Sequence, residues 1–103
     1  MRLERLCEEN QHLYNSAFAL YQSSFPVEER RDEAEQERVM KKQDYHFELI
    51  IDGDNCLGVM LYWETDRFIF LEHFTTYPEI RGQGKDAIAL SLLKNNGFTL
   101  FLQ

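Results

Sequence analysis

The chain of 103 residues is long enough for one domain, and its 44% apolar and 14% aromatic residues exclude a disordered protein. Its 11 basic and 18 acidic residues give a net charge of -7, which argues against general nucleic-acid binding. No apolar run approaches the roughly 18 residues of a membrane span. We therefore expect neither a nucleic acid nor a membrane as partner.

The two cysteines, Cys7 and Cys56, are isolated in the sequence. Neither has the CxxC or Cys/His spacing of a metal site, so we predict free thiols and no bound metal. The first dozen residues are charged and polar, which is unlike a signal peptide. These features together predict a protein of the reducing cytoplasm.

A short first strand is predicted over residues 1–6, followed by an amphipathic helix from about Asn10 to the Phe25-Pro26 pair. The helix is indicated by apolar residues at three- and four-residue spacing: Leu13, Tyr14, Ala17, Phe18 and Tyr21. A second helix is predicted from Val27 to Lys42, just after Pro26. Its acidic start and basic end suit the helix dipole, and its alternating charges predict a solvated helix laid over the domain.

Three strands are predicted over residues 45–52, 56–64 and 68–76, with turns so short that they form an antiparallel meander. A third helix is expected from about Gly84 to Lys94, with an apolar side made of Ile88, Ala89, Leu92 and Leu93. It should stop at residues 95–97, with Asn96 or Gly97 in the left-handed conformation.

The last strand, residues 98–103, is nearly all apolar, so we expect it to be buried on both faces by neighbours. The element order is then β-α-α-β-β-β-α-β in a single domain over residues 1–103. The fold class is α/β (α+β), with a mixed, mainly antiparallel sheet flanked by helices.

The stretch YPEIRGQGKD, residues 77–86, joins the fourth strand to the third helix. Gly82 and Gly84 allow backbone N–H groups to turn toward one point, and the helix that follows adds the positive end of its dipole. Arg81 and Lys85 add charge that suits a pyrophosphate. The spacing of a Walker loop and of a dinucleotide fingerprint are both absent. Taken alone, RGxG fits a structural turn equally well.

The order of the elements, the RGQGKD loop, Pro78, the Glu72-His73 pair and the segment SSFPVEERR together resemble the GNAT superfamily of N-acetyltransferases. The resemblance covers almost the whole chain. It implies that acetyl-coenzyme A is the co-substrate and that a small-molecule or peptide amine is the acceptor. The residues that it places along the co-substrate are Phe74, Thr75, Thr76, Arg81, Gly82, Gln83, Gly84, Lys85, Asp86 and Ala87.

The same resemblance makes Glu72 the candidate catalytic base and places Phe25, Glu28 and Glu29 on the acceptor side. A base is chemically sensible, because an amine attacks a thioester only when it is neutral. Glu72 could instead pair with a basic neighbour, and His73 is expected to be structural. Regular alternation puts Glu72 on the side of Phe70 and Phe74 and His73 on the opposite side, unless a bulge shifts the phase.

Two departures from the family pattern favour an alternative function. Asp86 stands where the family has Gly or Ala, and its carboxylate should weaken coenzyme A binding. The resemblance also implies a further helix and two strands, so the domain is expected to be C-terminally truncated. The alternative is a catalytically impaired GNAT-fold binding module, completed by a homodimer that covers the last strand.

Overall fold

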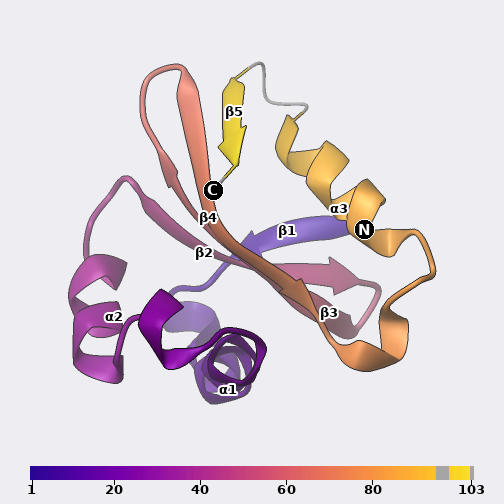
Figure 1. The fold of residues 1–103 in the computed structure, drawn as a ribbon, viewed down its shortest axis with the longest axis horizontal. Helices are drawn as coiled ribbons and strands as arrows, with labels where there is room; N and C mark the ends of the chain where they lie inside the picture. Colours follow the sequence, from indigo (N-terminus) through magenta and orange to yellow (C-terminus); the bar gives the residue numbers. More distant parts are fainter. Residues whose placement is uncertain (95–97, 103) are drawn as a thin grey trace.

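Five strands form one mixed sheet in the computed structural model, which describes residues 1–94 and 98–102 (Figure 1). In spatial order they are β1 (Arg2–Arg5), β2 (Tyr45–Asp52), β3 (Asn55–Glu64), β4 (Phe68–Thr76) and β5 (Thr99–Leu102). The first four pair antiparallel, and β5 joins β4 in parallel. The predicted sheet and the predicted order of elements are confirmed.

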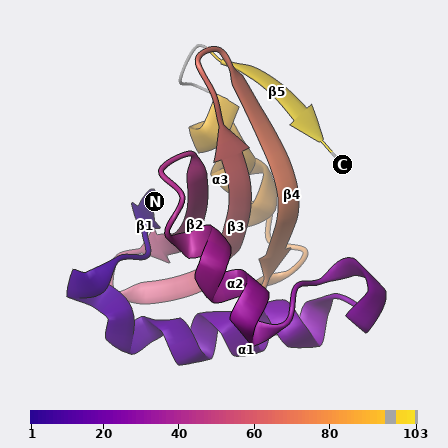
Figure 2. The same ribbon diagram turned by 90° about the vertical axis from the view of Figure 1, so that its left-hand side faces the viewer.

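Three α-helices cover the two faces of the sheet: α1 (Tyr14–Ser24), α2 (Glu33–Met40) and α3 (Lys85–Lys94). α1 and α2 lie on one face and α3 lies on the other (Figures 1 and 2). The side chains of β2 and β3 alternate between two apolar clusters, as expected for central strands. The α1 side takes Phe47, Leu49, Val59 and Leu61, and the α3 side takes Ile50, Met60, Tyr62, Ala89 and Leu93.

The first helix begins later than predicted. A 3-10 segment over Glu8–Leu13 precedes α1 and is kinked at Asn10, where φ is -118°. The Asn10 side chain accepts the backbone N–H of Cys7 at 2.7 Å and donates to the carbonyl of Arg5 at 3.0 Å. Such bonds from a side chain to the backbone compete with the helix ladder, which explains the delayed start.

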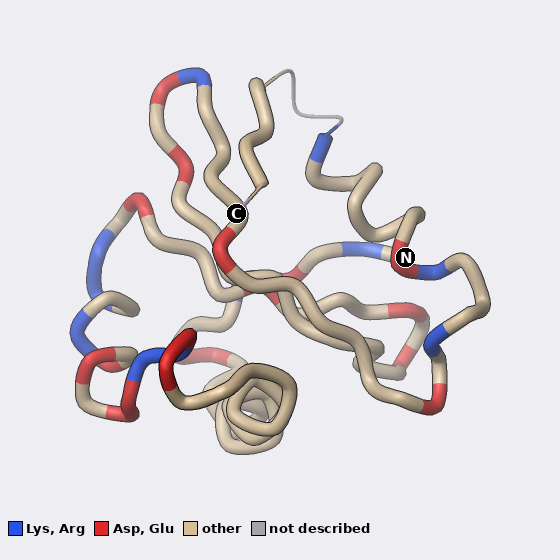
Figure 3. Tube along the Cα trace, viewed as in Figure 1, with Lys and Arg blue, Asp and Glu red and all other residues tan. Residues whose placement is uncertain are grey.

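The predicted second helix over residues 27–42 was too long. Val27–Glu29 is a separate 3-10 turn, and α2 begins only at Glu33. The reason is Asp32, which has an extended backbone and accepts the backbone N–H of Glu35 at 2.8 Å, as an N-cap does. Glu28 and Glu29 therefore do not occupy the first turn of α2. Charges of both signs do alternate along this segment (Figure 3).

One prediction about the C-terminal part is wrong. On α3, Ala89 and Leu93 are buried, but Ile88 is 51% exposed because it lies one position away from the buried face. On β5, Phe101 and Leu102 are 46% and 62% exposed in the chain alone. The expected cover of this strand by a missing segment or a partner chain stays a prediction. The expected left-handed stop at Asn96 or Gly97 lies outside the described residues. No helix in the described ranges is long and apolar enough to cross a membrane.

Candidate functional site

The glycine turn predicted from the sequence is present between β4 and α3. Gly82 and Gly84 have φ values of +82° and +77°, in the left-handed region that other residues rarely adopt. A Cβ atom placed on either glycine would meet no other atom within 4 Å. The backbone conformation therefore demands glycine here, and the space beside the turn is open to a ligand.

The basic residues of this loop are held by the protein. Arg81 donates from Nη2 and Nε to the carbonyl of Thr76, at 2.8 and 3.1 Å, and Nη2 lies 3.3 Å from the Thr75 hydroxyl. Lys85 lies 3.6 Å from a carboxylate oxygen of Asp52. Asp86 and Ala87 are exposed in the first turn of α3. The loop is thus fastened to β4 by Arg81, while Asp86 faces solvent.

The strand that leads into this loop has an open edge. Within the described residues 98–102, β5 pairs with β4 only as far as Leu71, which faces Leu102. On the other edge, Tyr77 donates its backbone N–H to Leu57 of β3. Backbone N–H and C=O groups point alternately to the two edges of a strand. Those of Thr75, like the N–H of Tyr77, therefore point to β3, and those of Phe74 and Thr76 point to the open edge. The carbonyl of Thr76, which accepts from Arg81, confirms this direction.

A β-bulge interrupts β4 at Glu72. Leu61 of β3 faces His73, but the next residue, Tyr62, faces Leu71, so Glu72 is the extra residue. Leu71 packs in the apolar cluster on the α3 side, whereas His73 packs against the ring of Tyr21 on α1, with ring centroids 4.9 Å apart. The bulge therefore breaks the regular alternation that the sequence predicted, and it puts Glu72 and His73 on the same side.

Glu72 forms an ion pair with Arg31, a residue of the segment before α2. Nη2 of Arg31 lies 2.8 and 3.0 Å from the two carboxylate oxygens, and both side chains are less than 20% exposed. Burial alone would lower the pKa of Arg31, but the hydrogen bond and the charge of Glu72 raise it above its ordinary value. Of the two roles considered for Glu72, pairing with a basic neighbour is therefore observed.

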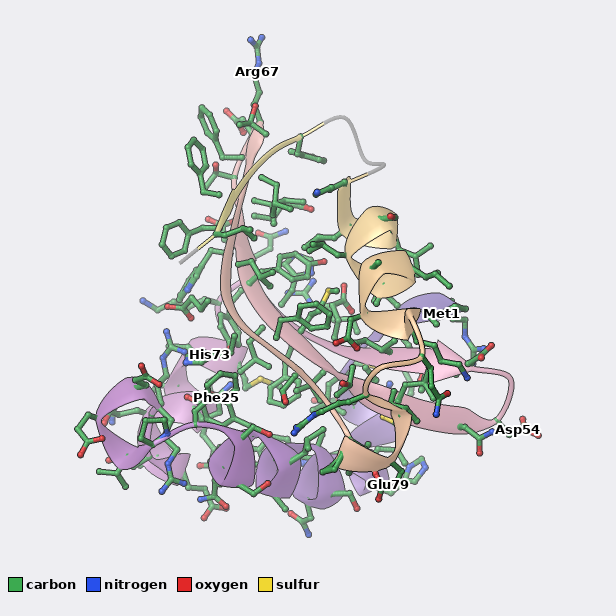
Figure 4. All side chains as sticks on the ribbon, turned by 45° about the vertical axis from the view of Figure 1, so that its right-hand side comes forward. Met1, Phe25, Asp54, Arg67, His73 and Glu79 are labelled. Carbon is green, nitrogen blue, oxygen red and sulfur yellow. The ribbon has the colours of Figure 1, made fainter. Side chains whose placement is uncertain are left out.

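His73 fastens the neighbouring segment. Its Nε2 lies 2.7 Å from the backbone carbonyl of Glu29, which can only accept, so Nε2 carries the proton. The ring of Phe25 meets His73 edge-on at 4.7 Å, and the two side chains lie close together in Figure 4. The expected structural role of His73 agrees with these contacts.

A cavity of about 410 Å³ lies above these residues and is lined by Phe25, Glu28, Glu29, Glu72 and His73. It brings together all three residues predicted for the acceptor side and the predicted base. They come from the segment after α1 and from the bulge of β4, elements that are about 45 residues apart in the sequence. A pocket with three carboxylates suits a cationic ligand.

No protein-family model and no curated protein matches this chain, but solved structures do. A protein from Bacteroides thetaiotaomicron, described as an acetyltransferase of the GNAT family, superposes with a TM-score of 0.88 and 27% identity over 99% of this chain and 59% of that one. The chain has the GNAT fold.

More distant GNAT-fold structures include two aminoglycoside acetyltransferases. One, from an uncultured soil metagenomic sample and solved with sisomicin, has a TM-score of 0.68 and 14% identity over 99% of this chain and 76% of that one. An aminoglycoside 6'-N-acetyltransferase solved with coenzyme A has a TM-score of 0.69 and 17% identity over 94% and 55%. The chain thus spans less than two thirds of the Bacteroides protein, whose length exceeds its own.

Sequence reasoning did not find Arg31, the residue of this GNAT-fold site that contacts Glu72. It lies in a run of alternating charges that carries no periodic signal. Arg31 contacts Tyr21 and Tyr45, of which the sequence predicted the first only as an apolar helix residue and the second only as the start of a strand. Cys7 and Cys56 are free, as predicted, and no group of three or more His, Cys, Asp or Glu suited to a metal occurs within residues 1–94 and 98–102.

Proposed function

We propose that the chain binds acetyl-coenzyme A along the open edge of β4 and transfers the acetyl group to a primary amine held beside Glu72. The observation that carries the proposal is the continuity of three features. The open edge at Phe74 and Thr76 leads through a 3-10 turn, Pro78–Ile80, into the left-handed glycine turn and then to the N-terminus of α3. The acceptor cavity opens at the bulge at Glu72, two residues before Phe74, where that edge begins.

The co-substrate would lie along two kinds of backbone donor. The pantetheine arm would pair with the backbone groups of Phe74 and the N–H of Thr76, in the manner of an added strand, because the Thr76 carbonyl is already held by Arg81. The pyrophosphate would lie over residues 81–87, where glycine N–H groups and the positive end of the α3 dipole favour an anion. The open space beside Gly82 and Gly84 agrees with this placement. The backbone of Thr75 faces β3, so Thr75 would not pair with the pantetheine arm through its backbone. Its side-chain hydroxyl donates to the hydroxyl of Ser24 at 3.0 Å.

The acceptor would enter the cavity with its amine toward Glu72. Thioesters supply an activated acetyl group, and a neutral amine attacks the carbonyl carbon, so that the C–N bond forms and the C–S bond breaks. Glu72 would accept the proton of the amine, directly or through water. Its carboxylate has about four lone pairs, so it can serve the acceptor while it is paired with Arg31. Glu28 and Glu29 would attract the remaining positive charge of a cationic small molecule or peptide.

The proposal is tested by calorimetry with coenzyme A and by release of free thiol from acetyl-coenzyme A. Sisomicin and 1,4-diaminobutane would serve as trial amines. We expect saturable binding of coenzyme A and thiol release that requires an amine. The variant Glu72→Gln should keep the binding of coenzyme A and lose turnover by about 10²-fold or more. Equal turnover by Glu72→Gln would exclude the base role.

A GNAT-fold binding module without turnover is the second candidate, and the surroundings of the loop favour it. The charges of Arg81 and Lys85 are already engaged by Thr76 and Asp52, and Asp86 forms no ion pair in the described part of the chain. This candidate predicts no thiol release with any amine. It also predicts a homodimer that covers the exposed Phe101 and Leu102 of β5. A monomer in sedimentation velocity would remove the dimer from consideration.

A further inference from the structure

Glu72 stands between the acceptor cavity and Arg31. The cavity is lined by Glu72 but not by Arg31. Arg31 instead lines a neighbouring hollow together with Arg30, Asp32 and other residues before α2. The Glu72 carboxylate is therefore held by Arg31 and at the same time lines the cavity, where a ligand can reach it.

Arg31 is fixed in place before any ligand arrives. Its backbone N–H donates to the hydroxyl of Tyr21 at 2.7 Å, and its guanidinium lies 5.4 Å from the ring centroid of Tyr45. The two tyrosines are 0% and 1% exposed, so both anchors belong to the core. Cation–π contacts of this kind gain strength when they are shielded from water. An incoming amine would therefore meet a Glu72 carboxylate that is already paired with Arg31.

The charge of Arg31 has a chemical consequence for the amine. An unpaired carboxylate would favour the ammonium form, which cannot attack a thioester. Paired with Arg31, Glu72 keeps lone pairs for an N–H hydrogen bond but offers little net charge. Glu28 and Glu29 are exposed, so water and salt screen their attraction. We propose that Arg31 determines acceptor specificity: by neutralising Glu72 it weakens the hold on ammonium and favours the neutral amine.

This inference rests on the proposed acceptor pocket, but its test needs no coenzyme A, so the two can fail separately. The probe is 1,4-diaminobutane at pH 7, where both of its amines are protonated. Its affinity is measured by NMR titration for the wild-type chain, Arg31→Met, Glu72→Gln and the double variant. Met keeps much of the length of Arg and removes the charge.

The expected order of affinity follows the net charge of the pair. Arg31→Met leaves a bare carboxylate and should bind the diamine about tenfold more tightly than wild type. Glu72→Gln leaves a bare guanidinium and should bind about tenfold more weakly. The double variant is neutral, like the wild type, and should bind within about threefold of it. Arg31→Lys keeps the charge and should also stay near the wild-type affinity.

A merely structural role for Arg31 gives a different order, because the double variant would then bind most weakly. That result, or tighter binding by Arg31→Met that persists when Glu72 is also replaced, would overturn the inference. The inference would also be overturned if neither the wild-type chain nor any of the variants bound the diamine. If Arg31→Met does not fold because Glu72 is left unpaired, the double variant and Glu72→Gln still decide the question. The double variant must then bind more tightly than Glu72→Gln.

Discussion

Replacing Asp86 by Asn tests whether this loop still accepts a pyrophosphate. Asp86 is exposed in the first turn of α3, two residues after the left-handed Gly84. The proposed pyrophosphate position lies over the same turn, so the carboxylate and the phosphates would repel each other. Asn has nearly the same shape and a similar helix propensity, and it removes only the charge.

The size of the effect follows from Coulomb's law. One carboxylate about 7 Å from each of two phosphate charges costs about 1 kcal/mol in water-like screening, and about twice that at a partly shielded site. Asp86→Asn should therefore lower the Kd for coenzyme A by about 5- to 30-fold. The same substitution should lower the free energy of unfolding, because a negative charge in the first turn of a helix contributes about 0.3–1 kcal/mol. Affinity and stability should thus change in opposite directions.

Calorimetry with coenzyme A measures the affinity, and urea unfolding measures the stability. Asp66→Asn is the matched control, because Asp66 lies before the other end of the nine-residue strand β4, about 30 Å from the loop. It makes the same change in net charge and should leave the Kd unchanged. The advantage of Asp86→Asn should shrink at about 0.5 M salt, where screening is strong. An unchanged or higher Kd for Asp86→Asn in low salt would refute the electrostatic argument.

Three further predictions concern stability, each measured by urea unfolding. Gly84→Ala should lose about 1–2 kcal/mol because φ is +77°, whereas Gln83→Ala, with an ordinary φ, should stay within about 0.5 kcal/mol; equal losses would contradict the conformational argument. Gly58→Ala should lose about 2 kcal/mol or more, because its Cβ would overlap the backbone oxygen of Thr75 and lie 2.7 Å from the Cα of Thr76; a neutral result would mean that β3 and β4 can separate freely. Burial, with smaller contributions from Glu33 and Glu37, raises the pKa of Tyr14 to about 12. The contribution of the Tyr14 hydroxyl to stability is therefore complete below about pH 10 and is lost between about pH 10 and 12. Tyr14→Phe should therefore reduce the loss of stability in that interval, and an unchanged alkaline profile would contradict this assignment.

The sheet could be predicted from the sequence because its signals are local. Runs rich in β-branched, aromatic and other apolar residues, bounded by short polar turns, define the strands β2 and β3 and their pairing. The start of α2 was missed because the local sequence offers two possible helix starts. Asp32 is a good N-cap, yet the preceding Pro26 with Glu28 and Glu29 is an equally good helix start. Only the packing of the segment against β4 through Glu29 and Arg31 decides between them.

The candidate site was predicted less well because its geometry depends on one inserted residue. Without the bulge at Glu72, alternation would place Glu72 and His73 on opposite faces of the sheet. With it, these neighbouring residues hold both ends of the segment from Glu29 to Arg31, one through a ring nitrogen and the other through a carboxylate. The same bulge follows Leu71, the last residue of β4 that pairs with β5 among the described residues, and the open edge begins just beyond it. A single irregularity thus shapes the cavity beside Glu72 and places it next to the proposed co-substrate edge. The pattern of apolar and polar residues does not reveal this insertion, because Glu72 gives the same polar position whether the strand is regular or bulged.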